Sequence, residues 1–233
     1  MFRSRRRPIV FSQYEHARLA GALARHWGNE RFPRPPLPFE SFVAGVVLHD
    51  FGYGLLDEHP IGAMAAAERR ATLERLVDAR LADPIAETVA LFHARRLIGQ
   101  ADPALAARCE RRIEAALAHT GYSRAAHETA DRITDLCDSI AFHFCFESAR
   151  RGAVEVECVA TSATPSTTRP LDWTLDEHGR VTLEPWPLSV PRLDTDVIAF
   201  EATGFPATLV PLTVACGIAP ARGPRLRPAD RSR

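Results

Sequence analysis

The period of the hydrophobic pattern changes once along this chain of 233 residues, near residue 150, and this change limits the possible folds. Between about residues 12 and 150 apolar residues recur three and four positions apart, which indicates amphipathic helices. Between about residues 153 and 216 they alternate with polar residues, as in "AVEVECVA", which indicates strands. We therefore predict a mainly α protein of the α+β class, in which a helical part carries a small C-terminal antiparallel β element.

The same patterns suggest how the chain is divided. We expect a helical domain over residues 1–151 and a small antiparallel β element, packed on it, over residues 152–217. Residues 218–233 are rich in Arg and Pro, and we expect them to form a disordered tail.

Sequence signals mark where several helices begin and end. In "SQYE", Ser12 and Glu15 have the spacing of a capping box, which predicts a first helix that ends near Gly28. The pairs Asp83-Pro84 and Asp102-Pro103 each place a capping residue before a proline at the first helical position. The helices expected after the first cover about residues 39–50, 61–81, 103–119 and 123–150, and another begins at Pro84 and includes Leu97.

Composition excludes several classes of protein. The formal net charge is zero, so no general attraction to nucleic acid or to an anionic membrane is expected. No apolar run approaches the roughly 20 residues needed to cross a bilayer. The five cysteines form no CxxC pair, and the N-terminus has no apolar signal region, so we expect a cytoplasmic protein with reduced, buried thiols.

Four of the expected helices direct a metal-binding type of side chain to an apolar face. His16 lies on the apolar stripe of the first helix, and His93 and Asp138 are surrounded by apolar residues in theirs. The buried segment "VAGVVLHDFGYG" ends in His49 and Asp50. A single core histidine is usually hydrogen-bonded, but five such groups favour a metal site, because buried imidazoles and carboxylates need a partner.

The order of these groups, H…HD…D, resembles that of the HD-domain superfamily, an all-helical metal-dependent fold best known for phosphohydrolases. Within it, the chain looks like an uncharacterised bacterial family. The resemblance implies an HD-like helical bundle in which His16, His49, Asp50 and Asp138 ligate one metal ion. It rests on the segments "SQYEHARLAGALARHWG", "VVLHDFGYG", "ALFHARRL", "DLCDSIAF" and "GRVTLEPWPL".

The resemblance leaves open whether the centre holds one ion or two. Dinuclear members of the superfamily have two further histidines, which here would be His59 in "DEHPIG" and His93. The segment "HPIG" is also similar to the cyclic-di-nucleotide phosphodiesterase branch. That branch has paired histidines near the position of His93, where this chain has "FHAR". The alternative for His59 is a solvated loop residue before Pro60.

The residue types suggest the chemistry. Imidazoles and carboxylates without thiolates favour Fe, Mn, Co, Ni, Zn or Mg over a soft metal. Such an ion activates water and polarises a phosphoryl oxygen, and Asp50 is placed to bridge two ions if both are bound. Arg95 and Arg96 follow His93 and are candidates to neutralise a substrate phosphate, the alternative being an exposed helix end. Asp135, one turn before Asp138, is expected to support a ligand or face solvent.

Three functions remain after these considerations. The first is a metal-dependent hydrolase of a small phosphate ester, such as a nucleotide, and the second is a di-iron oxygenase of the same superfamily. The third is a non-catalytic protein that retains the scaffold, and a homo-oligomer is compatible with all three. The sequence has no phosphate-binding glycine loop and no nucleophile elbow, which weakens kinase, NTPase and serine-hydrolase interpretations.

Overall fold

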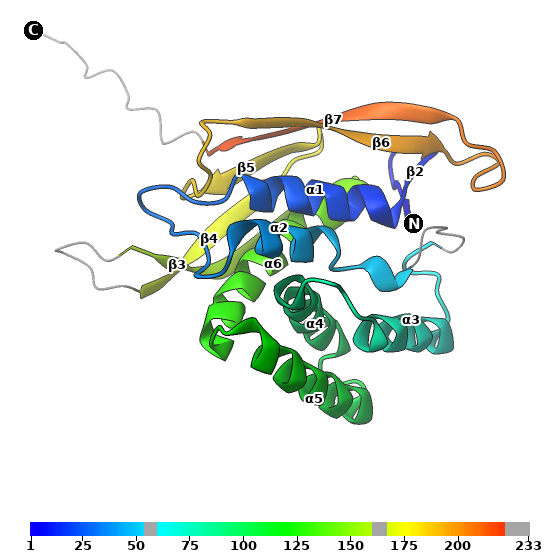
Figure 1. Ribbon diagram of the computed structural model, residues 1–233. Helices are drawn as coiled ribbons and strands as arrows, with labels where there is room; N and C mark the ends of the chain where they lie inside the picture. The colour runs from blue at the N-terminus through cyan, green and yellow to red at the C-terminus, as the bar shows by residue number, and fades with distance from the viewer. Residues whose placement is uncertain (54–59, 160–166, 222–233) are drawn as a thin grey trace, which may run out of the picture.

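The structure, a computed structural model, describes residues 1–53, 60–159 and 167–221 (Figure 1). Within these residues the chain forms six α-helices and one seven-stranded sheet. The helices lie on one side of the sheet, with α1 next to it and α5 on the far side of the helical layer (Figure 1). The helices and the short 3-10 helix η1 are α1 (Gln13–Arg25), α2 (Phe39–Val47), η1 (Phe51–Tyr53), α3 (Ala66–Asp78), α4 (Pro84–Ile98), α5 (Pro103–Thr120) and α6 (Arg124–Cys145).

The predicted helix starts are confirmed at three positions. The Ser12 side chain accepts a hydrogen bond from the backbone N–H of Glu15, and Asp83 and Asp102 cap α4 and α5 in the same way. The Glu15 carboxylate instead accepts from the backbone N–H of Ile198 in the sheet. The start of α1 is thereby tied to the sheet as well as capped.

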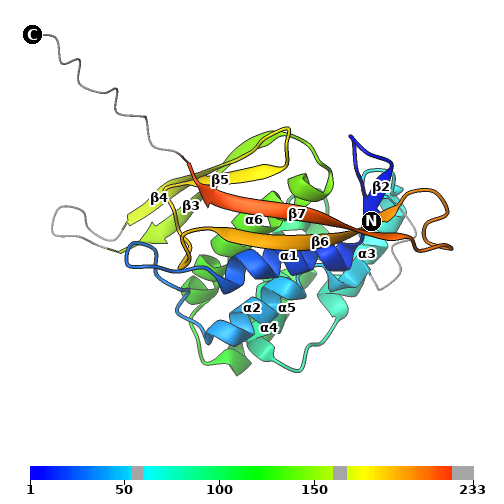
Figure 2. The same ribbon diagram turned by 90° about the horizontal axis from the view of Figure 1, so that it is seen from above.

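The sheet contains strands from both ends of the chain. Its order is β1-β2-β6-β7-β5-β4-β3, and all neighbours are antiparallel except β5 and β7, which are parallel. Seen from above, β6 and β7 run across α1 and α6 (Figure 2). The strands are β1 (Phe2–Arg3), β2 (Ile9–Phe11), β3 (Arg150–Cys158), β4 (Thr167–Leu175), β5 (Arg180–Glu184), β6 (Leu193–Glu201) and β7 (Pro211–Pro220).

The predicted fold class is wrong. The chain is not a mainly helical, HD-like bundle with a small antiparallel β element, because its six helices pack against a curled, mixed seven-stranded sheet. Two causes explain the error. Strands β1 and β2 have two and three residues, too few to show a period of two. The parallel pairing of β5 with β7 joins segments that are distant in sequence, which local patterns do not reveal.

The proposed division at residues 151 and 217 stays a prediction. Strands β1 and β2, from the N-terminal part, join the same sheet as β3 to β7. Strand β7 extends to Pro220, and residues 222–233 of the expected tail lie outside the described residues.

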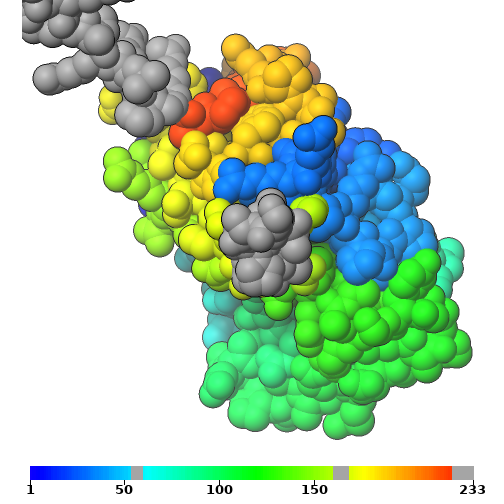
Figure 3. All heavy atoms as spheres, turned by 90° about the vertical axis from the view of Figure 1, so that its left-hand side faces the viewer, coloured from blue at the N-terminus to red at the C-terminus, as the bar shows by residue number. Residues whose placement is uncertain are grey.

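The helices pack on the sheet through one large apolar core, in which Trp27, Phe11 and Phe42 are almost fully buried. A second apolar cluster joins α3, α4 and α5. In the space-filling view the blue surface of the N-terminal helices lies between the strands and the green surface of the later helices (Figure 3). Helices α1 and α2 thus lie between the sheet and the later helices, and one face of each is buried.

None of the helices within the described residues is long and apolar enough to cross a membrane. All five cysteines are described and buried, and none of them forms a disulfide.

Helices α2 and α4 approach each other closely at Gly45. A Cβ added there would lie 2.6 Å from Val89 Cβ and 3.0 Å from the backbone oxygen of Ala86. We expect Gly45→Val to lower the free energy of unfolding by about 1–3 kcal/mol, because a tightly packed core resists added methyl groups. Urea unfolding measures this, with Ala44→Val, at the half-buried neighbouring position, as control. Equal midpoints for the two variants would contradict the prediction.

Candidate metal centre

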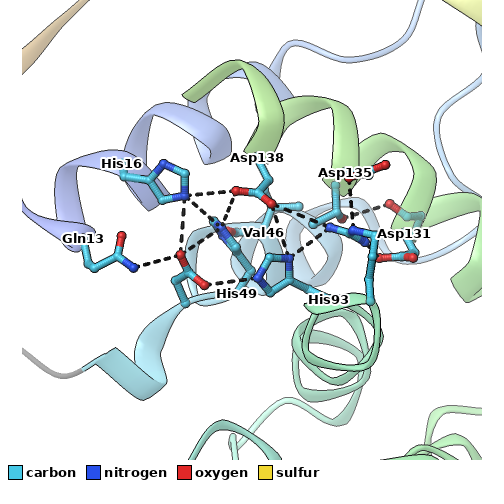
Figure 4. Close-up of polar contacts among 12 residues, drawn as sticks. Gln13, His16, Val46, His49, His93, Asp131, Asp135 and Asp138 are labelled. Atoms are coloured by element: carbon cyan, nitrogen blue, oxygen red, sulfur yellow. Dashed lines mark hydrogen bonds and ion pairs between the residues drawn. The ribbon is translucent and has the colours of Figure 1, made fainter. Parts of the chain in front are cut away.

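Five predicted residues from four parts of the helical layer meet in one buried cluster (Figure 4). His16 comes from α1, His93 from α4 and Asp138 from α6, whereas His49 and Asp50 follow the end of α2. The three histidines are at most 1% exposed, and the side chains of Asp50 and Asp138 are 9% and 14% exposed. The structure thus brings together residues that are separated by up to 122 positions, counted from His16 to Asp138.

The tightest part of the cluster is formed by two imidazoles and two carboxylates. His16 Nε2 lies 3.2 Å from His49 Nε2 and 3.1 Å from Asp138 Oδ1. His49 Nε2 lies 3.4 Å from Asp138 Oδ1 and 3.6 Å from Asp50 Oδ2. The distance between His16 Nε2 and Asp50 Oδ2 is 3.5 Å. Four potential ligand atoms therefore converge on one point, each from a different side chain.

The break after α2 lets the adjacent residues His49 and Asp50 face the same point. The predicted helix over residues 39–50 ends early, at Val47, with Leu48 as its C-cap. Within a helix, adjacent side chains diverge by about 100°, because a turn takes 3.6 residues. The early end of α2 therefore lets both side chains reach the cluster. The glycines that follow were the sequence signal for this helix end.

The protonated nitrogen of neutral His49 is set by a backbone carbonyl. Its Nδ1–H donates to the Val46 oxygen at 2.6 Å. In the neutral imidazole the other nitrogen, Nε2, then carries the lone pair, and Nε2 is the atom that faces His16, Asp50 and Asp138. This is the arrangement by which proteins orient metal-binding histidines.

His93 approaches the cluster from the other side of Asp50. Its Nε2 lies 3.1 Å from Asp50 Oδ1, and its Nδ1 lies 3.0 Å from Arg96 Nη2 and 3.6 Å from Asp138 Oδ2. Two groups of three residues each have ligand atoms that lie within 4.8 Å of one another. One group is His16, His49 and Asp138, and the other is His49, Asp50 and His93. The predicted role of His93 as a ligand stays a prediction.

The two candidate arginines lie in different places. Arg96 contacts the cluster, 3.8 Å from Asp138 Oδ2, and pairs with Asp131 and, at 3.0 Å, with Asp135. Arg95 instead pairs with Glu110 of α5 at 2.9 Å. The structure thus places Arg96 beside the ligands, where its guanidinium is already surrounded by carboxylates, and turns Arg95 towards α5.

Sequence reasoning missed Gln13. This residue is buried in the first turn of α1, and its amide Nε2 donates to Asp50 Oδ2 at 3.2 Å. The spacing of three residues before His16 was the available signal, because positions three apart share a helix face. His59, the sixth predicted ligand, lies outside the described residues.

The charges in the cluster shift the pKa values of its members. Burial by itself lowers the pKa of His49, but Asp50 and Asp138 outweigh burial and raise it to about 9. Burial raises the pKa of both carboxyl groups, yet the neighbouring histidines hold the pKa of Asp50 below its usual value and that of Asp138 well below it. Burial and the charge on His49 lower the pKa of His93. One imidazolium therefore compensates two carboxylates.

These residues fit a divalent metal ion by the chemistry of the donor set. They offer nitrogen and oxygen ligands without sulfur, which suits Fe, Mn, Co, Ni, Zn or Mg. A divalent cation in place of the His49 proton would balance two buried carboxylates that otherwise share one positive charge. His16 Nδ1 is buried and has no hydrogen-bond partner within the described part of the chain, so Nε2 is the atom through which His16 acts in the cluster.

Similarity to known proteins covers only part of this site. No curated protein and no solved structure matches the chain. One family matches residues 2–68, a segment that includes His16, His49 and Asp50 but not His93 or Asp138. The N-terminal part of the chain is thus similar to a protein family of unknown function, DUF3891.

Proposed function

We propose that the protein is a metal-dependent hydrolase of a small phosphate ester. One divalent ion would be held by His16, His49, Asp50 and Asp138. The observation that supports this most is that His16 Nε2 and His49 Nε2 lie 3.2 Å apart and that each lies within 3.1–3.6 Å of one oxygen of Asp50 and one of Asp138. Two imidazoles and two carboxylates form a nitrogen and oxygen donor set that suits a divalent ion.

The chain's own residues would prepare this centre in three ways. The Val46 carbonyl orients His49, and the Gln13 amide orients Asp50. The apolar surroundings, including the Phe2 ring whose centroid lies 4.7 Å from that of His16, keep bulk water from the ligands. When bound, a divalent ion lowers the pKa of water and polarises a phosphoryl oxygen. The proposed substrate is therefore a phosphorylated small molecule.

The ligand order also supports a relation to the HD-domain superfamily, and we propose it for the metal site alone. The match is the order H…HD…D, formed by His16, His49-Asp50 and Asp138. The proposed relation to the superfamily does not extend to the seven-stranded sheet.

A di-iron oxygenase is a second candidate, because His49, Asp50 and His93 form a second group of possible ligands. It requires two ions per chain, whereas the hydrolase requires one. The third possibility, a non-catalytic scaffold, requires no metal-dependent activity.

Metal content and activity of the purified protein separate these candidates. One Mn, Co, Ni, Zn or Mg ion per chain, with hydrolysis of compounds in a panel of nucleotides and sugar phosphates, would support the hydrolase. Two irons per chain would support the oxygenase. If the protein binds no divalent ion, and His49→Ala changes neither stability nor activity, both enzymatic functions fail.

Metal binding should release a proton, because the raised pKa of His49 means that its imidazole is doubly protonated at neutral pH. A ligand nitrogen must be unprotonated, so the ion competes with this proton. The affinity for the ion should therefore increase with pH, about tenfold per pH unit. The increase should level off near pH 9, where His49 is already neutral in the metal-free protein.

Calorimetric titration with Zn²⁺ at pH 7, in buffers of different ionisation enthalpy, counts the released protons. We expect about one proton per ion from this group. The exposed His178 supplies a control, since His178→Ala should leave the count unchanged. An affinity that does not vary between pH 6 and 9 would argue against His49 as a ligand.

A further inference from the structure

We propose that Arg96 is a positioning residue that fixes the proton of His93 on Nε2 and thereby keeps His93 from ligating a metal. The centre then holds one ion, and His93 acts as a hydrogen-bond donor to the ligand Asp50. This inference rests on the proposed function, which it deepens by choosing between one ion and two.

The argument begins with the contact between Arg96 and His93. Arg96 Nη2 lies 3.0 Å from His93 Nδ1. A guanidinium has five N–H donors and no acceptor, and it stays charged in proteins. The hydrogen bond therefore exists only if Nδ1 of His93 accepts, and a neutral imidazole that accepts on Nδ1 carries its proton on Nε2.

The other nitrogen of His93 agrees with this assignment. His93 Nε2 lies 3.1 Å from Asp50 Oδ1, and a carboxylate only accepts. Nε2–H therefore donates to Asp50. A metal ligand needs a lone pair, and neither nitrogen of His93 has one available while Arg96 stays in place.

Arg96 is itself held in this position by α6. Its guanidinium pairs with Asp131 and, through Nε at 3.0 Å, with Asp135, one turn further along the same helix. Its side chain is 25% exposed. Three separate N–H groups thus have fixed partners, two carboxylates and one imidazole, so the guanidinium cannot turn away from His93 without losing them.

The two histidines beside Asp50 consequently have opposite protonation patterns. His49 Nδ1 faces an acceptor, the Val46 oxygen, so in the neutral imidazole its Nε2 is available to an ion. His93 Nδ1 faces a donor, Arg96, so its Nε2 is not. The choice between ligand and hydrogen-bond donor is made in each case by the partner of the outer nitrogen.

Nitrogen NMR of the full-length protein tests this assignment directly. Spectra of ¹⁵N-labelled protein would be recorded without metal and with Zn²⁺, and the His93 signals identified by their loss in His93→Gln. We expect an unprotonated Nδ1 and a protonated Nε2 for His93 in both samples. A Zn²⁺-bound or unprotonated Nε2 in the loaded protein would overturn the proposal.

Arg96→Leu tests whether Arg96 fixes the His93 proton, and Arg95→Leu is its matched control from the preceding position of α4. Without the donor, the His93 proton is expected to move to Nδ1 in part of the molecules, whereas Arg95→Leu should leave it on Nε2. An unchanged His93 signal in folded Arg96→Leu would overturn the role of Arg96. If Arg96→Leu does not fold, because it leaves Asp131 and Asp135 without a cation, the spectra of the unaltered protein still decide.

The number of Zn²⁺ ions bound per chain tests whether the centre holds one ion. We expect one ion per chain in the unaltered protein and still one in His93→Gln. Two ions that fall to one in His93→Gln would overturn the proposal while leaving a metal-dependent enzyme possible. If no ion binds at all, the proposed function fails, and the spectra of the metal-free protein still report the position of the His93 proton.

Discussion

Replacing His49 by Ala is expected to lower the affinity for a divalent ion by more than 100-fold. His49 Nε2 lies within 3.2–3.6 Å of ligand atoms of His16, Asp50 and Asp138. Loss of a residue that merely supports a ligand costs about 10–100-fold in metal affinity, so loss of a ligand should cost more. Any metal-dependent activity should be lost in proportion.

Competition with a fluorescent chelator measures the affinity of both proteins for Zn²⁺ and Mn²⁺. His178→Ala is the control, because His178 lies on the β4–β5 turn with a side chain 65% exposed. Its affinity should equal that of the unaltered protein. Equal affinity in His49→Ala would show that the cluster is not where the ion binds.

Phe2→Ala is expected to lower the free energy of unfolding by about 3–5 kcal/mol, the usual cost of removing a buried aromatic ring. Phe2 is fully buried although it belongs to the two-residue strand β1. Its ring makes edge contacts with Phe142 and Phe146, at centroid distances of 5.5 and 5.2 Å, and packs against His16 at 4.7 Å. The variant should also bind metal more weakly, because His16 loses its neighbour.

Urea unfolding of the metal-free protein gives the stability, and repetition with Zn²⁺ shows the effect on the site. Phe2→Leu, which keeps much of the volume, should lose less than Phe2→Ala. Leu209 is 58% exposed, and Leu209→Ala should change stability by no more than about 0.5 kcal/mol. If Phe2→Ala unfolds at the same urea concentration as Leu209→Ala, β1 contributes nothing to the core.

The helices and their buried polar groups could be predicted because both depend on local spacing. Capping residues marked the starts of α1, α4 and α5, and the three-and-four spacing placed His16 and His93 on apolar faces. A polar residue on such a face is informative, since it must find a partner in the core. Local spacing was therefore enough to select all five members of the cluster as candidates.

The sheet and the finer contacts of the site could not be predicted, because they depend on segments distant in sequence. The pairing of Ile9–Phe11 with β6 joins residues about 190 positions apart, and three residues show no pattern that requires it. The partner of Arg96 is equally non-local: Asp131 and Asp135 lie on α6, and only the packing of α4 on α6 brings them together. His93 could therefore be placed in the core but not given a role.

The carbonyl of Val46 connects the end of α2 to the orientation of His49. Had the helix continued, this oxygen would accept the backbone N–H of residue 50, four positions on. Because α2 ends at Val47, that bond is not formed, and the oxygen accepts instead from the backbone N–H of His49 at 3.4 Å and from its Nδ1–H at 2.6 Å. The end of the helix thus decides where the His49 ring lies. A substitution that lengthens α2 by a single turn would turn His49 and Asp50 about 100° apart, and we expect it to weaken metal binding without altering any residue that contacts the ion.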